Sequence, residues 1–267
     1  MGRTRVMIAG LPGKMATLVA GAISAQDDME LHNHALSEKD GNVHIVSSSV
    51  VMLIPPFLHQ ELLKHGDFDL IVDFTLPKSV NRNAALYCEL GIPFVMGTTG
   101  GDRQKLLDTV NDSGIPAVIG TNMAVPVVIF QSMIDFAAAN FGGSLNGFTL
   151  VIEESHQAQK QDPSGTAVSL LESFAALGMP LQKEQIVMIR DPMIQETKLS
   201  IPRQYLGGHG YHTYTLISAD GTVLLRFTHN ILGRSVYVDG ALKAIRFLAN
   251  HKDEKGRVFS MTDVLRG

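Results

Sequence analysis

The residues best suited to acid–base chemistry stand between Glu153 and Ala167. His156 is followed four positions later by Lys160, which places an imidazole that titrates near neutrality and an ammonium group on one loop. Ser164-Gly165-Thr166 then opens a helix, and the exposed amides of a helix start suit an anionic group. A lone histidine is more often structural. The combination nevertheless predicts a site that binds a carboxylate-bearing substrate and protonates it.

A second group of candidates forms a turn that follows an apolar strand and opens a helix. Glycines in such a turn let the backbone approach a pyrophosphate, which the helix amides then hold. The turn departs from the pattern G-x-G-x-x-G, since a third glycine is lacking at Ala16. An ordinary strand-to-helix turn is the alternative, but the βαβ pattern that follows favours a dinucleotide. The residues concerned are Gly10-Leu11-Pro12-Gly13-Lys14-Met15.

Small and hydroxyl-bearing residues follow two further apolar runs. They are Asp73-Phe74-Thr75 and Gly97-Thr98-Thr99-Gly100. At strand ends such residues leave room for a ribose and a nicotinamide, although threonine-rich turns also serve as helix caps. Three such loops at successive strand ends favour one shared ligand.

The choice between NADH and NADPH depends on the end of the second strand, near Leu36. Glu38 could accept a hydrogen bond from a ribose hydroxyl, as in NAD-dependent enzymes, whereas Ser37 and Lys39 could hold a 2′-phosphate. All three residues could also form a solvated loop. The sequence therefore predicts NADPH or NADH as cofactor and leaves the choice open.

Two stretches near the C-terminus carry weaker signals. Arg234 could hold a phosphate or a substrate carboxylate through its guanidinium group, or cap its neighbours. The run Gly207-Gly208-His209-Gly210 favours mobility or close packing over chemistry, because it is rich in glycine. Cys88 is the only cysteine, which excludes an internal disulfide and a CxxC site. We predict no metal site.

The elements that position these residues fall into two patterns. Up to residue 122, short apolar runs alternate with amphipathic stretches, which is typical of βαβ units. Uninterrupted apolar strands indicate a parallel sheet that is covered on both faces. We expect an α/β fold with a doubly wound, Rossmann-like parallel sheet and a ligand crevice at the carboxyl ends of its strands. The expected strands are 6–9, 43–47, 70–74, 93–96 and 116–119, and the expected helices are 15–25, 79–90 and 101–113.

After residue 122 the pattern changes. Helices at 127–141 and from Ser164 alternate with a strand at 149–153, and strands at 211–218 and 222–229 flank Asp220-Gly221, a strong hairpin signal. These elements predict a second, α+β domain built on a mostly antiparallel sheet. We place the dinucleotide-binding domain at 1–122 and the substrate-binding and oligomerisation domain at 123–235. The closing helix within 236–267 is expected to pack back on the first domain.

Composition excludes several classes of partner. The 267 residues suffice for two domains. A net charge of −4 with scattered Lys and Arg predicts no nucleic-acid partner, and no apolar run reaches the roughly 18 residues of a membrane span. The single cysteine and the absence of a signal-peptide pattern predict a cytoplasmic location, with the plastid stroma open if a transit peptide has been removed.

Taken together, the motifs resemble the dihydrodipicolinate reductases, now described as 4-hydroxy-tetrahydrodipicolinate reductases, over nearly the whole chain. The details are most similar to the plant-type branch, for example Phe94-Val95-Met96 and Ile189-Arg190-Asp191-Pro192. Two features depart from the common bacterial pattern: Gln157 replaces a second histidine that contacts the substrate, and the segment 160–165 is one residue shorter. The residues that carry the resemblance are 10–15, 73–75, 97–100, Glu154-Ser155-His156 with Lys160, and Ser164-Gly165-Thr166-Ala167.

The resemblance implies an NAD(P)H-dependent reduction of 4-hydroxy-tetrahydrodipicolinate to tetrahydrodipicolinate in lysine and diaminopimelate biosynthesis. It implies hydride transfer to the substrate ring, then protonation of the enamine by His156 and Lys160. It also implies domain closure and a homo-oligomer, either a dimer or a tetramer. Substrate would contact Gln157, Ser164, Gly165 and Thr166. Cofactor would contact Gly10, Leu11, Pro12, Gly13, Lys14, Met15, Ser37, Lys39, Phe74, Thr75, Gly97, Thr98, Thr99, Thr121, Asn122, Met123 and Arg234.

Two other classes of protein compete with this hypothesis. Another two-domain nicotinamide-dependent dehydrogenase would share the first domain but has no need of the His156–Lys160 arrangement. A non-catalytic dinucleotide sensor would gain nothing from a titratable His156 that faces a second anion site.

Overall fold

The chain forms two compact units, which are described separately below. The computed structural model describes residues 2–38, 43–47 and 49–267. Unit 1 comprises Met1–Val125 and Tyr237–Gly267, and unit 2 comprises Pro126–Val236. The sequence analysis placed these divisions at residues 122 and 236.

Unit 1 is built on an eight-stranded sheet with the order β12-β7-β6-β5-β1-β2-β4-β3. All neighbouring strands are parallel except β3 and β4, which form an antiparallel hairpin at one edge. The strands are β1 (Thr4–Ala9), β2 (Met29–Leu36), β3 (Val43–Val46), β4 (Ser49–Ile54), β5 (Leu70–Asp73), β6 (Phe94–Met96), β7 (Ala117–Ile119) and β12 (Val258–Phe259).

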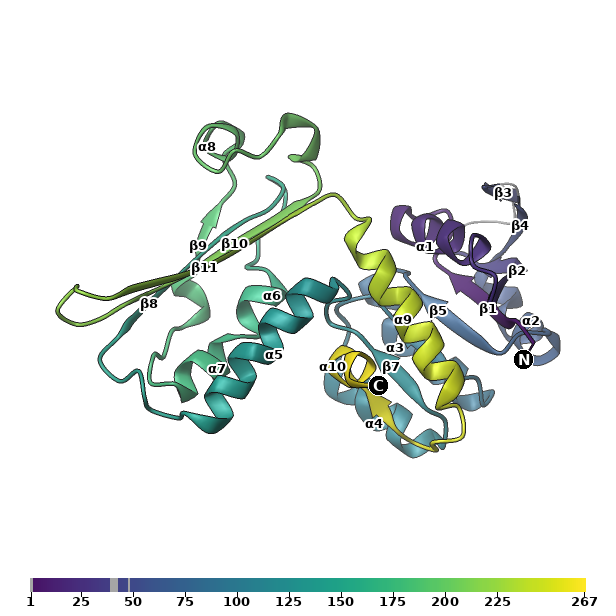
Figure 1. Cartoon of the computed structure of the whole chain (residues 1–267). Helices are drawn as coiled ribbons and strands as arrows, with labels where there is room; N and C mark the ends of the chain where they lie inside the picture. The colour runs from purple at the N-terminus through teal and green to yellow at the C-terminus, as the bar shows by residue number, and fades with distance from the viewer. Residues whose placement is uncertain (1, 39–42, 48) are drawn as a thin grey trace. The chain divides into compact units, whose positions relative to one another are not determined.

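Helices cover both faces of this sheet (Figure 1). Helices α1 (Lys14–Ser24) and α9 (Val236–Asn250) lie on one face, and α3 (Val80–Glu89) and α4 (Arg103–Ser113) lie on the other. The α3–α4 side buries Tyr87 and Leu106 against Phe94. Alternate strand residues thus face two helix layers, and this explains why the strands are apolar without interruption. The remaining helices are α2 (His59–His65), α10 (Met261–Arg266) and the short 3₁₀ turns η1 (Pro56–Leu58) and η2 (Pro77–Ser79).

Helix α9 is closely packed within unit 1. A Cβ atom on Gly240 would lie 2.0 Å from the carbonyl oxygen of Met123, so only glycine allows the helix this close to the chain. At the other end of the helix, Arg246 Nε donates to Asp28 Oδ2 at 2.7 Å. The closing helix is therefore part of the first compact unit.

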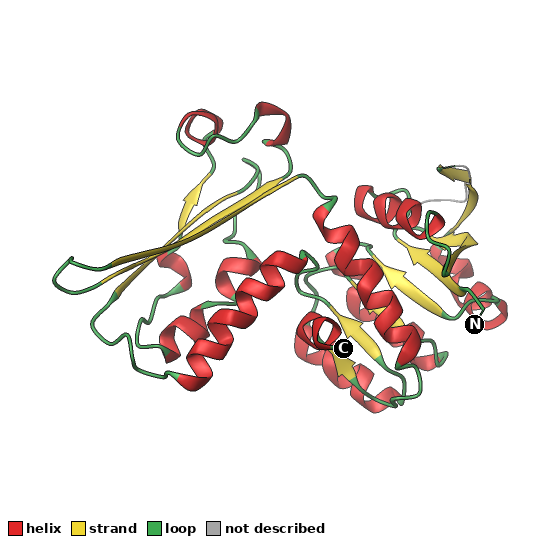
Figure 2. Ribbon diagram, in the orientation of Figure 1, coloured by secondary structure: helices red, strands yellow, loops and turns green. Residues whose placement is uncertain are grey.

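Unit 2 is an α+β unit with a four-stranded sheet in the order β11-β10-β8-β9 (Figure 2). β10 pairs antiparallel with both β8 and β11, whereas β8 and β9 are parallel. Phe130, Phe174 and Tyr214 join the helices and the sheet in one core. The elements are α5 (Val125–Asn140), β8 (Thr149–Ser155), α6 (Gly165–Val168), α7 (Leu171–Ala176), η3 (Lys183–Gln185), β9 (Val187–Ile189), α8 (Pro192–Thr197), η4 (Arg203–Tyr205), β10 (His209–Ile217) and β11 (Leu224–Leu232).

The architecture confirms the predicted fold class and corrects some elements. The segment expected as a strand of the parallel pattern at 43–47 is instead the antiparallel edge strand β3, where Val43 and Ile45 are exposed. Sequence patterns did not reveal β4, β9, β12, α2, α8 or α10. None of the helices in the described part of the chain is long and apolar enough to cross a membrane.

Candidate active site

The glycine turn of unit 1 has a backbone that only small residues permit. Gly10 has a φ of 112°, and a Cβ atom there would lie 2.2 Å from the carbonyl oxygen of Phe74. Gly13 is the N-cap of α1, and no side chain caps that helix. Within the described residues, no side chain therefore caps the first amides of α1, and Gly13 and Lys14 are exposed. This turn fits a pyrophosphate.

A single buried carboxylate joins the next two loops. Asp73, at the end of β5, is 0% exposed. Its Oδ1 accepts from the amide and the hydroxyl of Thr75 at 2.9 and 2.7 Å, and from Thr98 Oγ1 at 2.9 Å. Its Oδ2 accepts from Asn83 Nδ2 and from Tyr87 Oη, each at 2.9 Å. Burial and the Asp73 charge hold the pKa of Tyr87 well above its usual value, so the phenol stays a donor.

The end of β2 holds the residues on which the cofactor choice was expected to depend. Ser37 is buried, its amide donates to the carbonyl of Ile54, and its own carbonyl oxygen lies 3.2 Å from His59 Nε2. Glu38 accepts from Ser79 Oγ at 3.0 Å and forms an ion pair with Arg82. Lys39 lies outside the described residues.

The loop after β7 contains the last cofactor candidates of unit 1. Asn122 Oδ1 accepts from the amide of Ala124 at 2.9 Å. Met123 is buried, and its backbone lies against Gly240 of α9. Thr121 is exposed, as is Thr99 in the loop after β6. The loops after β1, β5, β6 and β7 all leave the carboxyl ends of parallel strands, where a doubly wound sheet binds its ligand.

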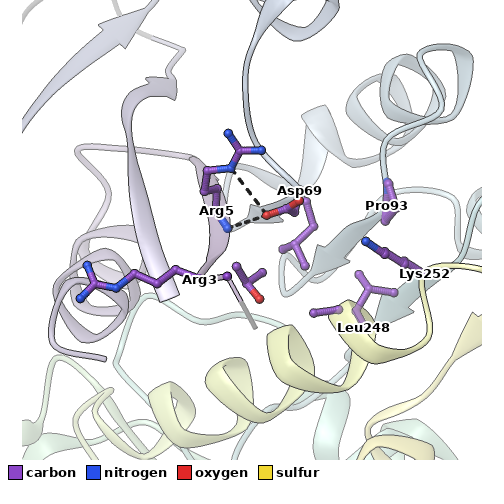
Figure 3. Close-up of a pocket in the computed structure, with 10 residues that line it drawn as sticks. Arg3, Arg5, Asp69, Pro93, Leu248 and Lys252 are labelled. Carbon is purple, nitrogen blue, oxygen red and sulfur yellow. Dashed lines mark hydrogen bonds and ion pairs between the residues drawn. The ribbon is translucent and has the colours of Figure 1, made fainter. Parts of the chain in front are cut away.

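A pocket of about 430 Å³ lies at the opposite ends of the strands, away from these loops (Figure 3). It is lined by residues at the amino ends of β1, β5 and β6 and by the end of α9. Figure 3 shows Arg5 joined to Asp69, so the charge of this guanidinium is already balanced. Because this pocket lies at the amino ends of the strands, it does not include the glycine turn, which follows the carboxyl end of β1.

In unit 2, His156 stands on the loop that follows β8. Its Nδ1 lies 3.0 Å from the carbonyl oxygen of His209, and a carbonyl only accepts, so Nδ1 carries a hydrogen. Its Nε2 lies 3.0 Å from Oε2 of Glu154. The two atoms are close enough for an ion pair. They do not form a hydrogen bond, since neither atom has a hydrogen-bond partner within the described residues.

Glu154 is fully buried and faces the guanidinium of Arg190 and the imidazole of His156. Its Oε1 accepts from Arg190 at 2.5 Å, and its Oε2 faces His156. Burial by itself raises the pKa of the Glu154 carboxyl, but the interactions with His156 and Arg190 outweigh burial and lower it. Glu154 is therefore an anion that supports a positive charge on its neighbours.

Arg190 and Gln195 hold the loop of His156 and Lys160 by its backbone. Arg190 Nε donates to the carbonyl of Lys160 at 2.7 Å. Gln195, 1% exposed, donates through Nε2 to the carbonyl of His156 at 2.8 Å. Backbone contacts of this kind fix the loop without engaging the side chains of His156 and Lys160.

A row of residues crosses the sheet beside this loop. His212 on β10 is paired in register with Glu154 on β8 and with His229 on β11, and the rings of His212 and His229 stack with centroids 4.6 Å apart. Ser164 Oγ lies 2.6 Å from His212 Nε2 and also accepts from the amide of Ala167 at 3.1 Å. Burial, with the charge of His156, lowers the pKa of His229 to about 4, and burial holds the pKa of His212 well below its ordinary value.

Of the site residues predicted in unit 2, the structure brings some together around His212 and shows no such contact for the others within the described part of the chain. His156 and Ser164 are both next to His212, whose ring is 5.2 Å from that of His156. Lys160, Gln157 and Thr166 are half-buried, and Gly165 is exposed. Arg234 is exposed and its guanidinium lies beside Gly208.

Sequence reasoning missed the roles of Arg190, Gln195, His209 and His212, and that of Asp73 as the carboxylate that joins two loops. The run 207–210 was interpreted as mobile or closely packed, and the structure favours close packing. His209 is 3% exposed, and a Cβ atom on Gly210 would lie 3.1 Å from the ring of His156. The available signal was a histidine at the start of a strand, since His209 is the first residue of β10.

The fold and these two clusters define a two-unit protein in which unit 1 is a dinucleotide-binding domain and unit 2 carries acid–base side chains. Residues 4–123 match the model of the dihydrodipicolinate reductase N-terminus, and residues 126–265 match that of the C-terminus. The chain belongs to the dihydrodipicolinate reductase family.

Individual relatives agree with this assignment. The chain is 39% identical to 4-hydroxy-tetrahydrodipicolinate reductase 1, chloroplastic, of Arabidopsis thaliana, across 98% of this chain and 77% of that protein. It is 30% identical to the 4-hydroxy-tetrahydrodipicolinate reductase of Methanobrevibacter smithii, across 98% of both proteins. The fold is similar to that of the dipicolinate-bound dihydrodipicolinate reductase from Paenisporosarcina sp. TG-14, with a TM-score of 0.67, 20% identity and 97% of each chain covered.

Proposed function

We propose that this protein reduces 4-hydroxy-tetrahydrodipicolinate to tetrahydrodipicolinate with NADPH or NADH, a step of lysine and diaminopimelate biosynthesis. The observation that carries the proposal is the cluster of His156, Glu154 and His212 beside the Ser164 loop, in a chain of this family. An imidazole backed by a buried carboxylate, next to a polar loop, is suited to give a proton to an anionic substrate.

The dinucleotide is assigned to unit 1. Its pyrophosphate would lie on residues 10–15, where the α1 amides have no side-chain acceptor. Ser37 and Lys39 would face the adenosine end, and Arg234 would contact a phosphate. The nicotinamide half would contact Phe74, Thr75, Gly97, Thr98, Thr99, Thr121, Asn122 and Met123. The bound nicotinamide supplies the hydride.

The protons are assigned to unit 2. His156 and Lys160 act as general acids toward the enamine that follows hydride transfer. Support for His156 comes from its ring contacts, because the His209 carbonyl accepts from Nδ1 and Nε2 lies beside Oε2 of the buried Glu154. Support for Lys160 comes from the Arg190 bond to its carbonyl, which fixes its place on the loop.

The dicarboxylate substrate is assigned to Gln157, Ser164, Gly165 and Thr166. Ser164 is 4% exposed and caps the first turn of α6, which leaves the amides of Gly165 and Thr166 at the start of that turn. Gln157 takes the place of a histidine in the bacterial pattern, and its amide is able to donate a hydrogen bond to a carboxylate without carrying charge.

A spectrophotometric assay tests the proposal. Freshly cyclised product of pyruvate and aspartate semialdehyde is added to purified protein with NADPH or NADH, and loss of reduced nicotinamide absorbance is followed. We expect loss that depends on both substrate and protein. Cofactor binding without turnover, for any preparation of this substrate, would support the dinucleotide-sensor alternative. Turnover of amino acids or sugars instead would support the other dehydrogenases.

We also propose a homo-oligomer built through the sheet of unit 2. Apolar side chains on its outer strands are exposed, among them Val187 and Met188 on β9 and Leu224 and Leu225 on β11. Light scattering after size exclusion is expected to give a dimer or a tetramer. We retain the cytoplasm as the proposed location, with the plastid stroma as the alternative that the name of the Arabidopsis relative suggests.

A further inference from the structure

Three polar atoms of unit 2 converge without a hydrogen-bond partner within the described residues. They are Oε2 of Glu154, Nε2 of His156 and Nδ1 of His212. All three lie within 4.8 Å of one another. Glu154 is 0% exposed and His212 is 3% exposed. An unpartnered polar atom at such depth costs about 1–3 kcal/mol. Glu154 and His156 offset part of this cost because their two atoms face each other at 3.0 Å, but neither atom makes a hydrogen bond within the described residues and neither does Nδ1 of His212, so the three together indicate a ligand.

Each of the three residues is held in place through its other polar atom. Arg190 binds Oε1 of Glu154, the carbonyl of His209 binds Nδ1 of His156, and Ser164 Oγ lies 2.6 Å from Nε2 of His212. Outer contacts of this kind fix the tautomer and orientation of metal ligands. Because the Ser164 oxygen is able to accept a second N–H besides that of Ala167, these contacts are compatible with the His212 tautomer that has its hydrogen on Nε2 and its lone pair on Nδ1.

Sheet register explains why the donors meet. Glu154 and His212 are direct partners across β8 and β10, so their side chains are on the same face. His156 follows two residues after Glu154 in the chain, and its ring packs edge-on to His212 at 5.2 Å. The donors therefore come from a paired sheet and from a loop fixed by its backbone. They need little rearrangement to close on an ion.

We propose that Glu154, His156 and His212 form a binding site for one divalent transition-metal ion, with Zn²⁺ as the best match. Two imidazoles and one carboxylate are a common ligand set for zinc. Zinc bonds of about 2.0–2.2 Å place tetrahedral ligands roughly 3.3 Å apart. The Glu154 and His156 atoms are 3.0 Å apart, so His212 makes the main adjustment. The sequence analysis predicted no metal site. His212 is distant in the chain from Glu154 and His156.

The consequence of binding is inhibition, and this part rests on the proposed function. A bound ion takes the Nε2 atom of His156, and any proton on that atom passes to solvent. His156 then has no proton for the substrate. The positive charge of Arg190 beside Glu154 opposes a second cation, so the ion exchanges with solvent and does not act as a permanent structural metal.

Cobalt binding tests the site without reference to activity. Protein free of any histidine tag is treated with chelator, dialysed, and titrated with Co²⁺ while visible absorption is recorded. We expect one ion per chain with the intense visible bands of a tetrahedral or five-coordinate centre, and displacement of Co²⁺ by Zn²⁺. Absence of such a spectrum would overturn the proposal.

Variants locate the ion. His156→Ala changes a loop side chain and Glu154→Gln keeps the shape of the buried acid, and each is expected to weaken Co²⁺ binding at least tenfold. His34→Ala, which removes a histidine of unit 1, is the matched control and leaves binding unchanged. Near-ultraviolet circular dichroism shows whether each variant keeps its packing. Binding that survives both substitutions in folded protein, or that is lost in His34→Ala, places the ion elsewhere and refutes the assignment.

Inhibition is measured separately. We expect Zn²⁺ to lower the reductase rate of the wild-type protein in proportion to occupancy of the cobalt site, with recovery on addition of EDTA. Cobalt binding at Glu154, His156 and His212 with an unchanged reductase rate at full occupancy would refute the inhibitory role. If the protein shows no reductase activity at all, the proposed function fails, while the spectroscopic result still decides whether the site exists.

Discussion

Arg190 Nε donates to the carbonyl oxygen of Lys160 at 2.7 Å, although the two residues belong to different segments of unit 2. The same guanidinium donates to the buried Glu154 and to the carbonyl of Asp162. Arg190 therefore positions the backbone of Lys160, one of the two proposed acids. It also positions the carboxylate of Glu154, which faces the other proposed acid, His156. A planar fork with several donors makes this possible, and lysine cannot reproduce it.

Arg190→Ala and Arg190→Lys are expected to lower kcat by about 10- to 100-fold, the usual effect of small misplacement of catalytic groups. The KM for cofactor should change little, because the proposed cofactor residues are mostly in unit 1. Arg203→Ala, an exposed arginine of the same unit, is the control. Steady-state kinetics, with thermal unfolding as a check on folding, provide the measurement. A normal kcat in folded Arg190→Ala would show that the loop holds its geometry unaided.

His156→Ala and Lys160→Ala are each expected to reduce turnover by about 10²-fold or more, the scale of a lost general acid. Cofactor affinity is expected to be unchanged in both. His251→Ala and Lys183→Ala serve as controls of the same residue types elsewhere in the chain. Rates close to wild type in both test variants would remove the two residues from the mechanism.

Gly13→Val is expected to abolish cofactor binding while unit 2 remains folded. A Cβ atom on Gly13 would lie 2.7 Å from the carbonyl oxygen of Gly10, so the turn cannot keep its shape. Gly2→Val is the control, since a Cβ atom there meets nothing within 4 Å. Cofactor fluorescence titration gives the affinity. An unchanged affinity would refute the phosphate role of this turn.

Acid is expected to destabilise unit 2 through His229. Its pKa is about 4 in the folded chain against an ordinary 6.5, so the unfolded chain binds the extra proton first. The unfolding free energy therefore falls as pH drops from 6.5 to 4, by up to about 3 kcal/mol at roughly 1.4 kcal/mol per pH unit for one proton. Stability at neutral pH is unaffected, because His229 is neutral in both states there.

His229→Phe tests this origin. The variant keeps an aromatic ring against His212 and removes two buried nitrogens that have no hydrogen-bond partner within the described residues. Its unfolding free energy, measured by urea titration of chelator-treated protein, should depend less on pH between 6.5 and 4. A slope equal to that of the wild type would assign the acid sensitivity to other groups, such as His212.

The sequence was sufficient for features that local pattern determines. The parallel strands β1, β5, β6 and β7 are confirmed because their apolar runs reflect burial on both faces, and the hairpin at Asp220-Gly221 is confirmed because the turn chemistry is local. The Asp220 carboxylate accepts from Ser218 and Thr222, as such a turn requires. Family membership followed from motif order along the chain.

Other features depend on contacts that no local pattern contains. β9 and β12 have only three and two residues, and their strand character comes from their partners β8 and β7. His212 faces Glu154 only because of the β8–β10 register, and a shift of one residue would turn it away. For the run 207–210 the sequence left mobility and close packing open, because the ring that packs on Gly210, that of His156, is distant in sequence.

The bonds at Asp73 have a consequence for anyone who redesigns the cofactor crevice. Thr75, Thr98, Asn83 and Tyr87 all donate to one carboxylate, so a change in any of them alters the hydrogen bonding of the rest. Substitutions at these positions are expected to show strong epistasis. Cofactor engineering here would succeed through libraries that vary the group jointly, and would stall if each position were optimised by itself.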